Sequence, residues 1–223
     1  MWGKLFRSTA GDGQGASKAG ATPAVRQDEP ANEEVSIKIA IVGDPQGGKS
    51  SLVRRFCDDR FSEEYIQTTG VNFVEKRIRL GANASDVVFT LNDLGSDASS
   101  ADFLPLVCDD ATAIVFAFDL TRKQSLLSVK ESYRKVRTLN KKAIVLLVGC
   151  KFDLFLDLEA EDQEEITSLA RRFARAMKAP LVFTSSSHSI NVQKVFKILF
   201  GCVFSIDSKI ERVTAVGEPI IEY

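Results

Sequence analysis

The sequence has 223 residues, and its 29 Lys and Arg against 30 Asp and Glu give a formal net charge of −1. At roughly 150 residues per domain, this length predicts one domain with short extensions. The balanced charge argues against a dedicated nucleic-acid-binding protein, which usually carries a basic excess. The 4 cysteines are scattered singly, which excludes a disulfide framework and a zinc site of the usual spacing. With a single histidine, His188, the sequence argues against a Ser-His-Asp mechanism or a histidine-rich metal site. It is expected to be structural or solvent-facing, and we expect a reducing, intracellular compartment.

Membrane and targeting signals are also missing from the sequence. No apolar run approaches the ~18 residues needed to span a bilayer. The first residues lack the apolar stretch of a signal peptide, and Trp2 stands where N-myristoylation requires glycine. The final residues, GEPIIEY, offer no cysteine for prenylation. We therefore expect a cytoplasmic protein without direct membrane insertion.

The chain divides into three parts by composition. Residues 1–35 are rich in small and polar residues and hold few large apolar groups, so they cannot bury enough surface to offset their ordering entropy. We predict a disordered N-terminal tail there. Residues 36–205 alternate between strand and helix patterns and are expected to form one domain. Residues 206–223 are expected to be a C-terminal extension, packed on the domain or trailing from it.

Strand and helix patterns alternate along the domain. In chain order they predict a strand at 36–43, a helix at 48–59, strands at 71–80 and 86–93 joined by a turn at 81–85, a helix before the next strand, a buried strand at 111–119, an amphipathic helix at 122–139, a buried strand at 142–150, a helix at 159–178, a short strand at 180–187 and a closing helix at 190–204. This order predicts an α/β fold with a mostly parallel six-stranded sheet, one antiparallel edge strand, and helices on both faces. In such sheets ligands bind beyond the carboxyl ends of the strands.

The segment GDPQGGKS at residues 43–50 matches the phosphate-binding pattern GxxxxGK[ST] at every fixed position. It follows a predicted strand and opens a predicted helix, as a P-loop NTPase requires, although a chance glycine turn followed by lysine is the alternative. Gly47 and Gly48 favour a curl of inward-pointing amides, Lys49 supplies charge for the β- and γ-phosphates, and the Ser50 hydroxyl suits Mg²⁺. The residues expected around the phosphates are Asp44, Pro45, Gln46, Gly47, Gly48, Lys49, Ser50 and Ser51. Pro45 removes one N–H from this loop, which we expect to alter catalysis more than binding.

In motif order and spacing, residues 36–205 resemble the Ras superfamily of small GTPases. Several longer strings resemble one branch of it, the septum-promoting, mitotic-exit GTPases of the septation-initiation network. These strings are FDLTRK at 118–123, LPLVC at 104–108, ARRFARAMKAPLVF at 170–183, SHSINVQKVFKI at 187–198 and GEPIIEY at 217–223. The resemblance therefore extends to residue 223 and implies a Ras-like G domain that binds GTP or GDP with Mg²⁺.

The resemblance implies roles for residues at matching positions. Thr68 matches the threonine of switch I, the loop that senses the γ-phosphate, and this threonine completes Mg²⁺ coordination. Asp93 matches the acid that holds Mg²⁺ through water, so Ser50, Thr68 and Asp93 form the implied metal site. Phe61 matches the aromatic that packs edge-on against guanine, and Tyr65 falls where the family often has a tyrosine near the phosphates.

Switch II, the second nucleotide-sensing loop, departs from the family pattern DxxGQ, because residues 93–97 are DLGSD. Ser96 replaces the glycine whose N–H contacts the γ-phosphate. Asp97 replaces the glutamine that orients the attacking water, and an ionised carboxylate repels phosphate and cannot donate a hydrogen bond. Lys49, Thr68 and the atypical Asp97 are the implied catalytic residues. We expect slow or impaired intrinsic hydrolysis, and the same departures argue against activation by a partner-supplied arginine.

The base-recognition motif also departs from the family pattern [NT]KxD, because residues 150–153 are CKFD. Asp153 is able to accept two hydrogen bonds from guanine, and Lys151 is able to lie over the ring. Cys150 is a weak donor, which predicts weaker affinity with retained guanine preference. The alternative for Cys150 is a small apolar residue that ends a buried strand. A further set matches the family's SAK segment, with Ser186 able to offer its N–H to guanine and Ser187 in place of the lysine: Ser185, Ser186 and Ser187.

These observations predict a small GTP/GDP-binding switch in cell-cycle signalling, covering mitotic exit, septation and cytokinesis. The resemblance implies a protein kinase effector, a two-component GTPase-activating complex and recruitment to a spindle pole body or centrosome, and we expect a monomer. One alternative is a hydrolysis-deficient pseudo-GTPase scaffold, motivated by Ser96, Asp97 and Cys150. Another is a Rab-type membrane-traffic GTPase, because TTGVNF at 68–73 resembles that switch I. The missing C-terminal cysteines count against the Rab-type alternative.

Overall fold

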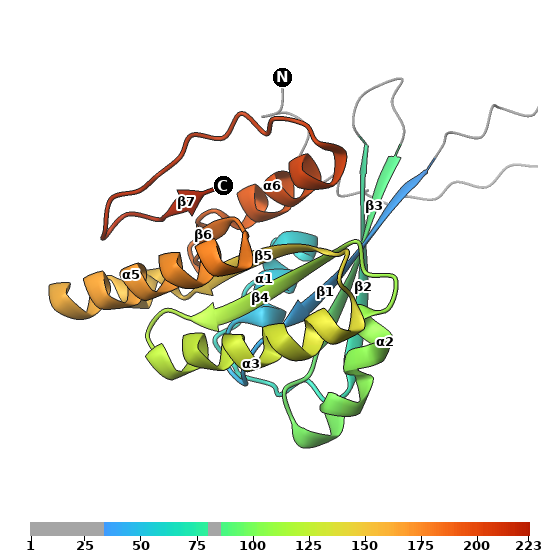
Figure 1. Cartoon of the computed structure of the whole chain (residues 1–223), viewed down its shortest axis with the longest axis horizontal. Coiled ribbons are helices and arrows are strands. Elements are labelled where there is room, and N and C mark those ends of the chain that lie inside the picture. Colours follow the sequence, from blue (N-terminus) through green and yellow to red (C-terminus); the bar gives the residue numbers. More distant parts are fainter. Residues whose placement is uncertain (1–33, 80–85) are drawn as a thin grey trace, which may run out of the picture.

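The computed structural model describes residues 34–79 and 86–223. Nearly all of the predicted N-terminal tail at 1–35 and the predicted hairpin turn at 81–85 lie outside the described residues. Figure 1 shows a central sheet with helices on both of its faces, as the sequence predicts. Within the described ranges, no helix has the length and apolar character that a bilayer span needs.

The elements follow one another much as the sequence pattern predicts. They are β1 (Val35–Val42), α1 (Lys49–Asp58), β2 (Val71–Arg79), β3 (Asp86–Leu94), the 3₁₀ helix η2 (Ala98–Phe103), α2 (Leu104–Cys108), β4 (Ala113–Asp119), α3 (Lys123–Leu139), β5 (Ile144–Cys150), α4 (Phe152–Phe155), α5 (Ala160–Met177), β6 (Leu181–Phe183), α6 (Val192–Phe204) and β7 (Ile221–Glu222). The strand predicted at 180–187 is shorter than expected, because the chain after Phe183 turns into the loop that carries three serines.

The sheet has seven strands in the order β2-β3-β1-β4-β5-β6-β7, rather than the six predicted. The strands from β3 to β6 are parallel, whereas β2 pairs antiparallel with β3 and β7 pairs antiparallel with β6. The second antiparallel edge corrects the prediction of a single one. It was missed because a two-residue strand is too short to show an alternating pattern.

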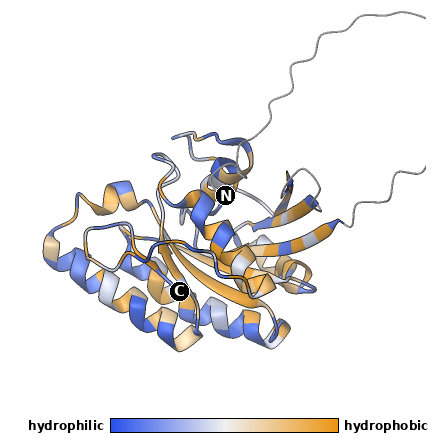
Figure 2. Cartoon of the chain, turned by 90° about the horizontal axis from the view of Figure 1, so that it is seen from above, coloured by the Kyte–Doolittle hydropathy of each residue, from blue (hydrophilic) through white to orange (hydrophobic). Residues whose placement is uncertain are grey.

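Each face of the sheet has its own apolar core. Leu126 of α3 and Ala170 of α5 are fully buried on one face, together with Phe116 of β4. Leu52 of α1 and Phe196 of α6 are fully buried on the other face. Figure 2 shows apolar strands in the middle and hydrophilic residues along the outer sides of the helices. Burial on both faces explains why β4 and β5 are continuous apolar runs in the sequence.

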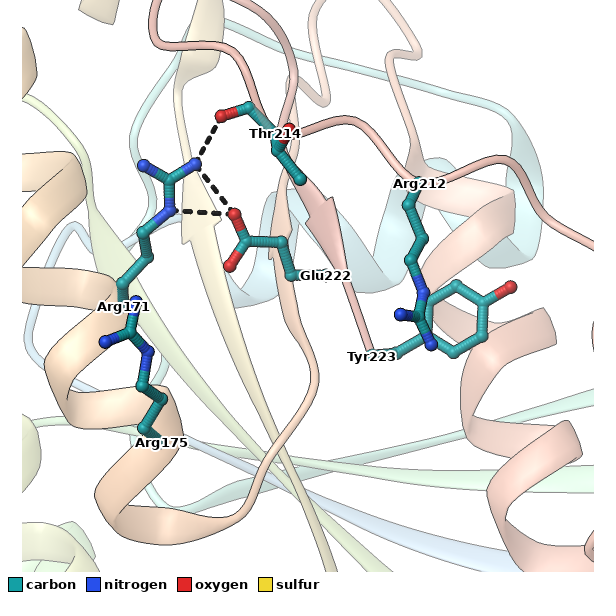
Figure 3. Close-up of a pocket in the computed structure, with 6 residues that line it drawn as sticks. All are labelled: Arg171, Arg175, Arg212, Thr214, Glu222 and Tyr223. Atoms are coloured by element: carbon teal, nitrogen blue, oxygen red, sulfur yellow. Dashed lines mark hydrogen bonds and ion pairs between the residues drawn. The ribbon is translucent and has the colours of Figure 1, made fainter.

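The C-terminal segment after α6 returns along the sheet edge and is fastened by side chains (Figure 3). The Nε atom of Arg171 donates to a carboxylate oxygen of Glu222 at 2.7 Å, and the same guanidinium donates to the carbonyl of Thr214. The guanidinium of Arg212 lies 5.1 Å from the ring centre of Tyr223, whose hydroxyl donates to a backbone carbonyl at residue 210. The segment therefore packs on the domain instead of trailing from it.

Candidate nucleotide-binding site

The phosphate loop joins the end of β1 to the start of α1 and is fixed by close packing. A side chain at Gly43 would come within 2.0 Å of the carbonyl oxygen of Ala117 on β4. Gly48 has a φ of +91°, and a Cβ there would lie 2.6 Å from the Cβ atom of Cys150. These positions therefore accept only glycine. Gly47 takes part in the turn, because its N–H donates to the carbonyl oxygen of Asp44 at 3.1 Å, and Gln46 between them adopts a left-handed φ of 58°.

Lys49 opens α1 and is almost completely buried at the bottom of the loop. Its Nζ atom donates to the carbonyl oxygens of Gly43 at 2.8 Å and Asp44 at 2.9 Å, and also to the hydroxyl of Ser96. Burial lowers the pKa of Lys49, and the nearby carboxylates of Asp93 and Asp44 oppose that shift. An anion in the loop would compensate for the desolvation of this ammonium.

The three residues of the implied metal site meet beside Lys49. The hydroxyls of Ser50 and Thr68 lie 3.0 Å apart. Asp93, at the end of β3, is fully buried, and neither of its carboxylate oxygens has a well-formed hydrogen bond among the described residues. Burial raises the pKa of this carboxyl, while Ser50 and Lys49 lower it. Two hydroxyls beside a buried, unsatisfied carboxylate fit Mg²⁺ and its water ligands.

Asp97, the expected catalytic position, faces the start of η2. Its carboxylate accepts a hydrogen bond from the hydroxyl of Ser100, which in turn accepts one from the N–H of Gly70 at 2.8 Å. The N–H of Gly95 donates to the carbonyl oxygen of Gly70 at 2.8 Å. Switch I and switch II are therefore joined through Ser100, a residue that the sequence analysis missed. The only sequence signal was a serine three residues after an aspartate at a helix start.

The base-recognition motif follows β5 and begins at a buried cysteine. Burial raises the pKa of the Cys150 thiol to about 12, so the thiol stays protonated and packs against Gly48. This favours its interpretation as a small apolar residue over any redox role. Lys151 adopts a left-handed φ of 63°, and Asp153 lies with a carboxylate oxygen 3.8 Å from the Nδ1 atom of His188.

A buried carboxylate that the sequence analysis did not select, Asp119, connects the two ends of the site. It accepts hydrogen bonds from Lys151 at 2.6 Å and from the Nε atom of Arg122 at 3.0 Å. Arg122 also donates to the carbonyl oxygen of Pro45 in the phosphate loop at 2.7 Å. Burial alone would raise the pKa of Asp119, but hydrogen bonds from Lys151, Thr121 and Arg122 lower it below its usual value. Nothing local in the sequence signals these contacts.

One cavity of about 650 Å³ brings most of the predicted residues together. The predicted residues that line it are Gln46, Gly47, Gly48, Lys49, Ser50, Ser51, Phe61, Tyr65, Thr68, Ser96, Cys150, Lys151, Asp153, Ser186 and Ser187. Among the other predicted residues, Asp44, Pro45, Asp93, Asp97 and Ser185 do not line it. The hydroxyl of Ser185 instead supports the loop, lying 2.9 Å from that of Ser187 and accepting from the N–H of His188. His188, Arg54 and Arg60 line the cavity and were not selected as site residues.

The strand order, together with a phosphate loop between β1 and α1, defines a Ras-like G domain of the P-loop class. Residues 38–204 match the model of the Ras family, and the chain belongs to that family.

A relative in Schizosaccharomyces pombe, septum-promoting GTP-binding protein 1, is 49% identical over 189 residues, which cover 85% of this chain and 94% of that protein. The chain is also 30% identical over 167 residues to the GTP-binding protein YPTM1 of Zea mays, covering 74% and 77% of the two chains. The Ras-related protein SEC4 of Saccharomyces cerevisiae is 28% identical over 182 residues, covering 81% and 80%. These similarities confirm the predicted superfamily and its septum-promoting branch.

Proposed function

We propose that this chain is a GTP/GDP-binding molecular switch that acts in cell division, binds nucleotide together with Mg²⁺ and hydrolyses GTP slowly. One observation carries the proposal: the phosphate loop, Thr68, and the base-recognising residues Lys151 and Asp153 line a single cavity of about 650 Å³. The cell-division role is supported by the 49% identity to the septum-promoting protein.

The proposal gives each group at the site a part in nucleotide binding. The loop amides and Lys49 bind the phosphates, and the Asp153 carboxylate selects guanine, because guanine alone offers an adjacent ring N–H and amino group. Ser50 and Thr68 would hold Mg²⁺ by their hydroxyls, with Asp93 acting through water. The ion supplies charge neutralisation at the phosphates when bound. Contacts of the γ-phosphate with Thr68 and the Ser96 N–H order the two switch segments, and their loss releases them.

Slow hydrolysis follows from the position and chemistry of Asp97. This residue does not line the cavity, and its carboxylate accepts a hydrogen bond from Ser100. While ionised, it cannot donate a hydrogen bond to an attacking water. The same features support the second candidate, a pseudo-GTPase scaffold, and single-turnover hydrolysis of bound GTP separates the two candidates. A slow but measurable rate supports the switch, whereas no detectable rate supports the scaffold.

The partners we propose are a protein kinase effector and a two-component GTPase-activating complex, with recruitment to a spindle pole body or centrosome. Their support is the similarity to the septum-promoting protein. Five large apolar side chains in and beside the switch segments are exposed, which is consistent with protein binding. They are Tyr65, Ile66, Phe73, Phe103 and Leu106.

The direct test identifies the nucleotide that co-purifies with the chain by chromatography and then measures its displacement by GDP, GTP and ADP. We expect a bound guanine nucleotide, much weaker competition by ADP, and loss of binding in Lys49→Ala. Lys130→Ala on α3 is a matched control, because Lys130 is exposed and does not line the cavity. Equal competition by adenine and guanine nucleotides, or unchanged affinity in Lys49→Ala, would contradict the proposal.

A further inference from the structure

The ammonium group of Lys49 has all three of its donors engaged by the chain itself. An ammonium offers three N–H donors and no acceptor. Its acceptors here are the carbonyl oxygens of Gly43 and Asp44, at 2.8 Å and 2.9 Å, and the hydroxyl oxygen of Ser96. A phosphate oxygen therefore reaches this nearly buried ammonium only by replacing one of the three.

Ser96 is the acceptor that belongs to a switch segment. Its hydroxyl also donates to the carbonyl oxygen of Gly43 at 3.2 Å, so it is held as donor and as acceptor at the same point. Ser96 is not among the residues of positive φ, so a side chain is present here without left-handed strain. A glycine could make neither contact. The other two acceptors belong to the phosphate loop, next to Lys49 in the chain.

We propose that the Ser96 hydroxyl is an internal ligand of Lys49 that the terminal phosphate of a nucleoside triphosphate displaces, and that it biases the site toward the diphosphate. The inference rests on the proposed nucleotide-binding function and adds a determinant of nucleotide preference. A phosphate oxygen is the stronger acceptor, because it is charged. Its net gain is smaller here, because the bonds of Ser96 to Lys49 and Gly43 break. In this proposal the β-phosphate, which both nucleotides carry, replaces one of the two loop carbonyls, so a diphosphate leaves Ser96 in place.

Displacement of Ser96 would be felt in switch I through its neighbour Gly95. A Cβ on Gly95 would lie 2.4 Å from the carbonyl oxygen of Thr68, so the two backbones are in close contact. The N–H of Gly95 also donates to the carbonyl of Gly70. Movement of Ser96 away from Lys49 would therefore shift the segment that carries Thr68. Replacement of Ser96 as the acceptor of Lys49 would in this way change the conformation of both switch segments.

The test compares the affinities of nucleotide-free full-length chain for GDP and for a non-hydrolysable β,γ-imido analogue of GTP by titration calorimetry in Mg²⁺. The variants are Ser96→Ala and Ser96→Gly, and the control is Ser128→Ala on α3, which does not line the cavity. In both Ser96 variants we expect the affinity for the analogue relative to GDP to rise about tenfold, the scale of one hydrogen bond to a charged group. The control should keep the wild-type ratio.

The outcomes separate this inference from the function on which it rests. If wild-type chain binds both guanine nucleotides and the Ser96 variants leave the ratio unchanged, the inference is wrong and the proposed function stands. An equal loss of affinity for both nucleotides would show a merely structural role and would also overturn it. If wild-type chain binds neither nucleotide, both fall together. Circular dichroism melts confirm that each variant is folded. If Ser96→Ala is destabilised, the affinity ratio measured for Ser96→Gly tests the inference.

Discussion

The Nζ atom of Lys151 lies 2.6 Å from a carboxylate oxygen of Asp119, because Asp119 ends β4 and Lys151 directly follows the neighbouring strand β5. Asp119 is almost completely buried and also accepts hydrogen bonds from Thr121 and Arg122. Its carboxylate therefore positions both Lys151, which we propose contacts the base, and, through Arg122, the phosphate loop.

Asp119→Asn should lower the free energy of unfolding by about 2 kcal/mol, because it removes the charge that three donors to a buried carboxylate require, while the partly exposed Lys151 and Arg122 keep some solvation. Urea unfolding measures this change. Glu131→Gln is a matched control, since Glu131 pairs with Lys135 on the exposed side of α3. The control should change stability by less than about 0.5 kcal/mol. An equal effect of both substitutions would contradict the role given to Asp119.

The pH dependence of stability should differ between wild-type chain and Asp119→Asn. The folded state holds the pKa of Asp119 below its usual value, so the carboxylate contributes stability above the unfolded-state pKa of about 4. That contribution is lost as the pH falls through the lower folded-state pKa. Because stability follows the difference in proton binding between the folded and unfolded states, the stability difference between the two proteins should be constant from about pH 5 to 7 and shrink below about pH 4. A difference that stays constant throughout would refute this assignment.

Asp97→Gln should raise the single-turnover rate of GTP hydrolysis about tenfold, because the neutral amide is able both to donate to and to accept from a positioned water. The substitution also removes the carboxylate that accepts the hydrogen bond from Ser100. Asp97→Asn is the control, since it removes the charge but keeps the short side chain. Rates are measured by chromatography of GTP-loaded chain. Equal rates in all three proteins would show that hydrolysis is limited elsewhere.

Cys150 should remain unmodified when the native chain is treated with iodoacetamide at pH 8, because its thiol is buried and its pKa is about 12. Unfolding should expose it to the reagent. Cys202 serves as the internal reference, because it is only partly buried. Mass spectrometry of peptides from the two reactions gives the comparison. Modification of Cys150 in the native chain at the rate of Cys202 would contradict its packing against Gly48.

The phosphate loop was predictable because its requirements are local. Glycines that accommodate tight packing, a lysine and a hydroxyl must all occur within eight positions, and the surrounding alternation of strands and helices gave their context. The detailed backbone was less predictable, since a residue other than glycine, Gln46, takes a left-handed conformation in the loop. A fixed motif identifies the loop but does not decide which neighbour of a glycine absorbs the turn.

The parts that were missed depend on contacts between distant residues. Asp119 and Arg122 reach Lys151 and Pro45 only after the sheet has formed, so no sequence spacing records the connection. Ser100 lay in a short polar run that resembled a simple loop. Strand β7 is two residues long, and its pairing with β6 depends on the fold of the intervening chain. Local periodicity therefore predicted the layers of the fold but not these contacts between residues that are distant in the sequence.

The pairing of Ile221 with Val182 has a consequence for synthesis of the protein on the ribosome. Ile220 and Ile221 are fully buried against the sheet that the preceding residues build. Until residues 221 and 222 have been added to the growing chain, the edge of β6 is uncovered and open to pairing with another nascent chain. A chain that stops short of β7 would therefore expose an unpaired strand edge, which favours association with other incomplete chains.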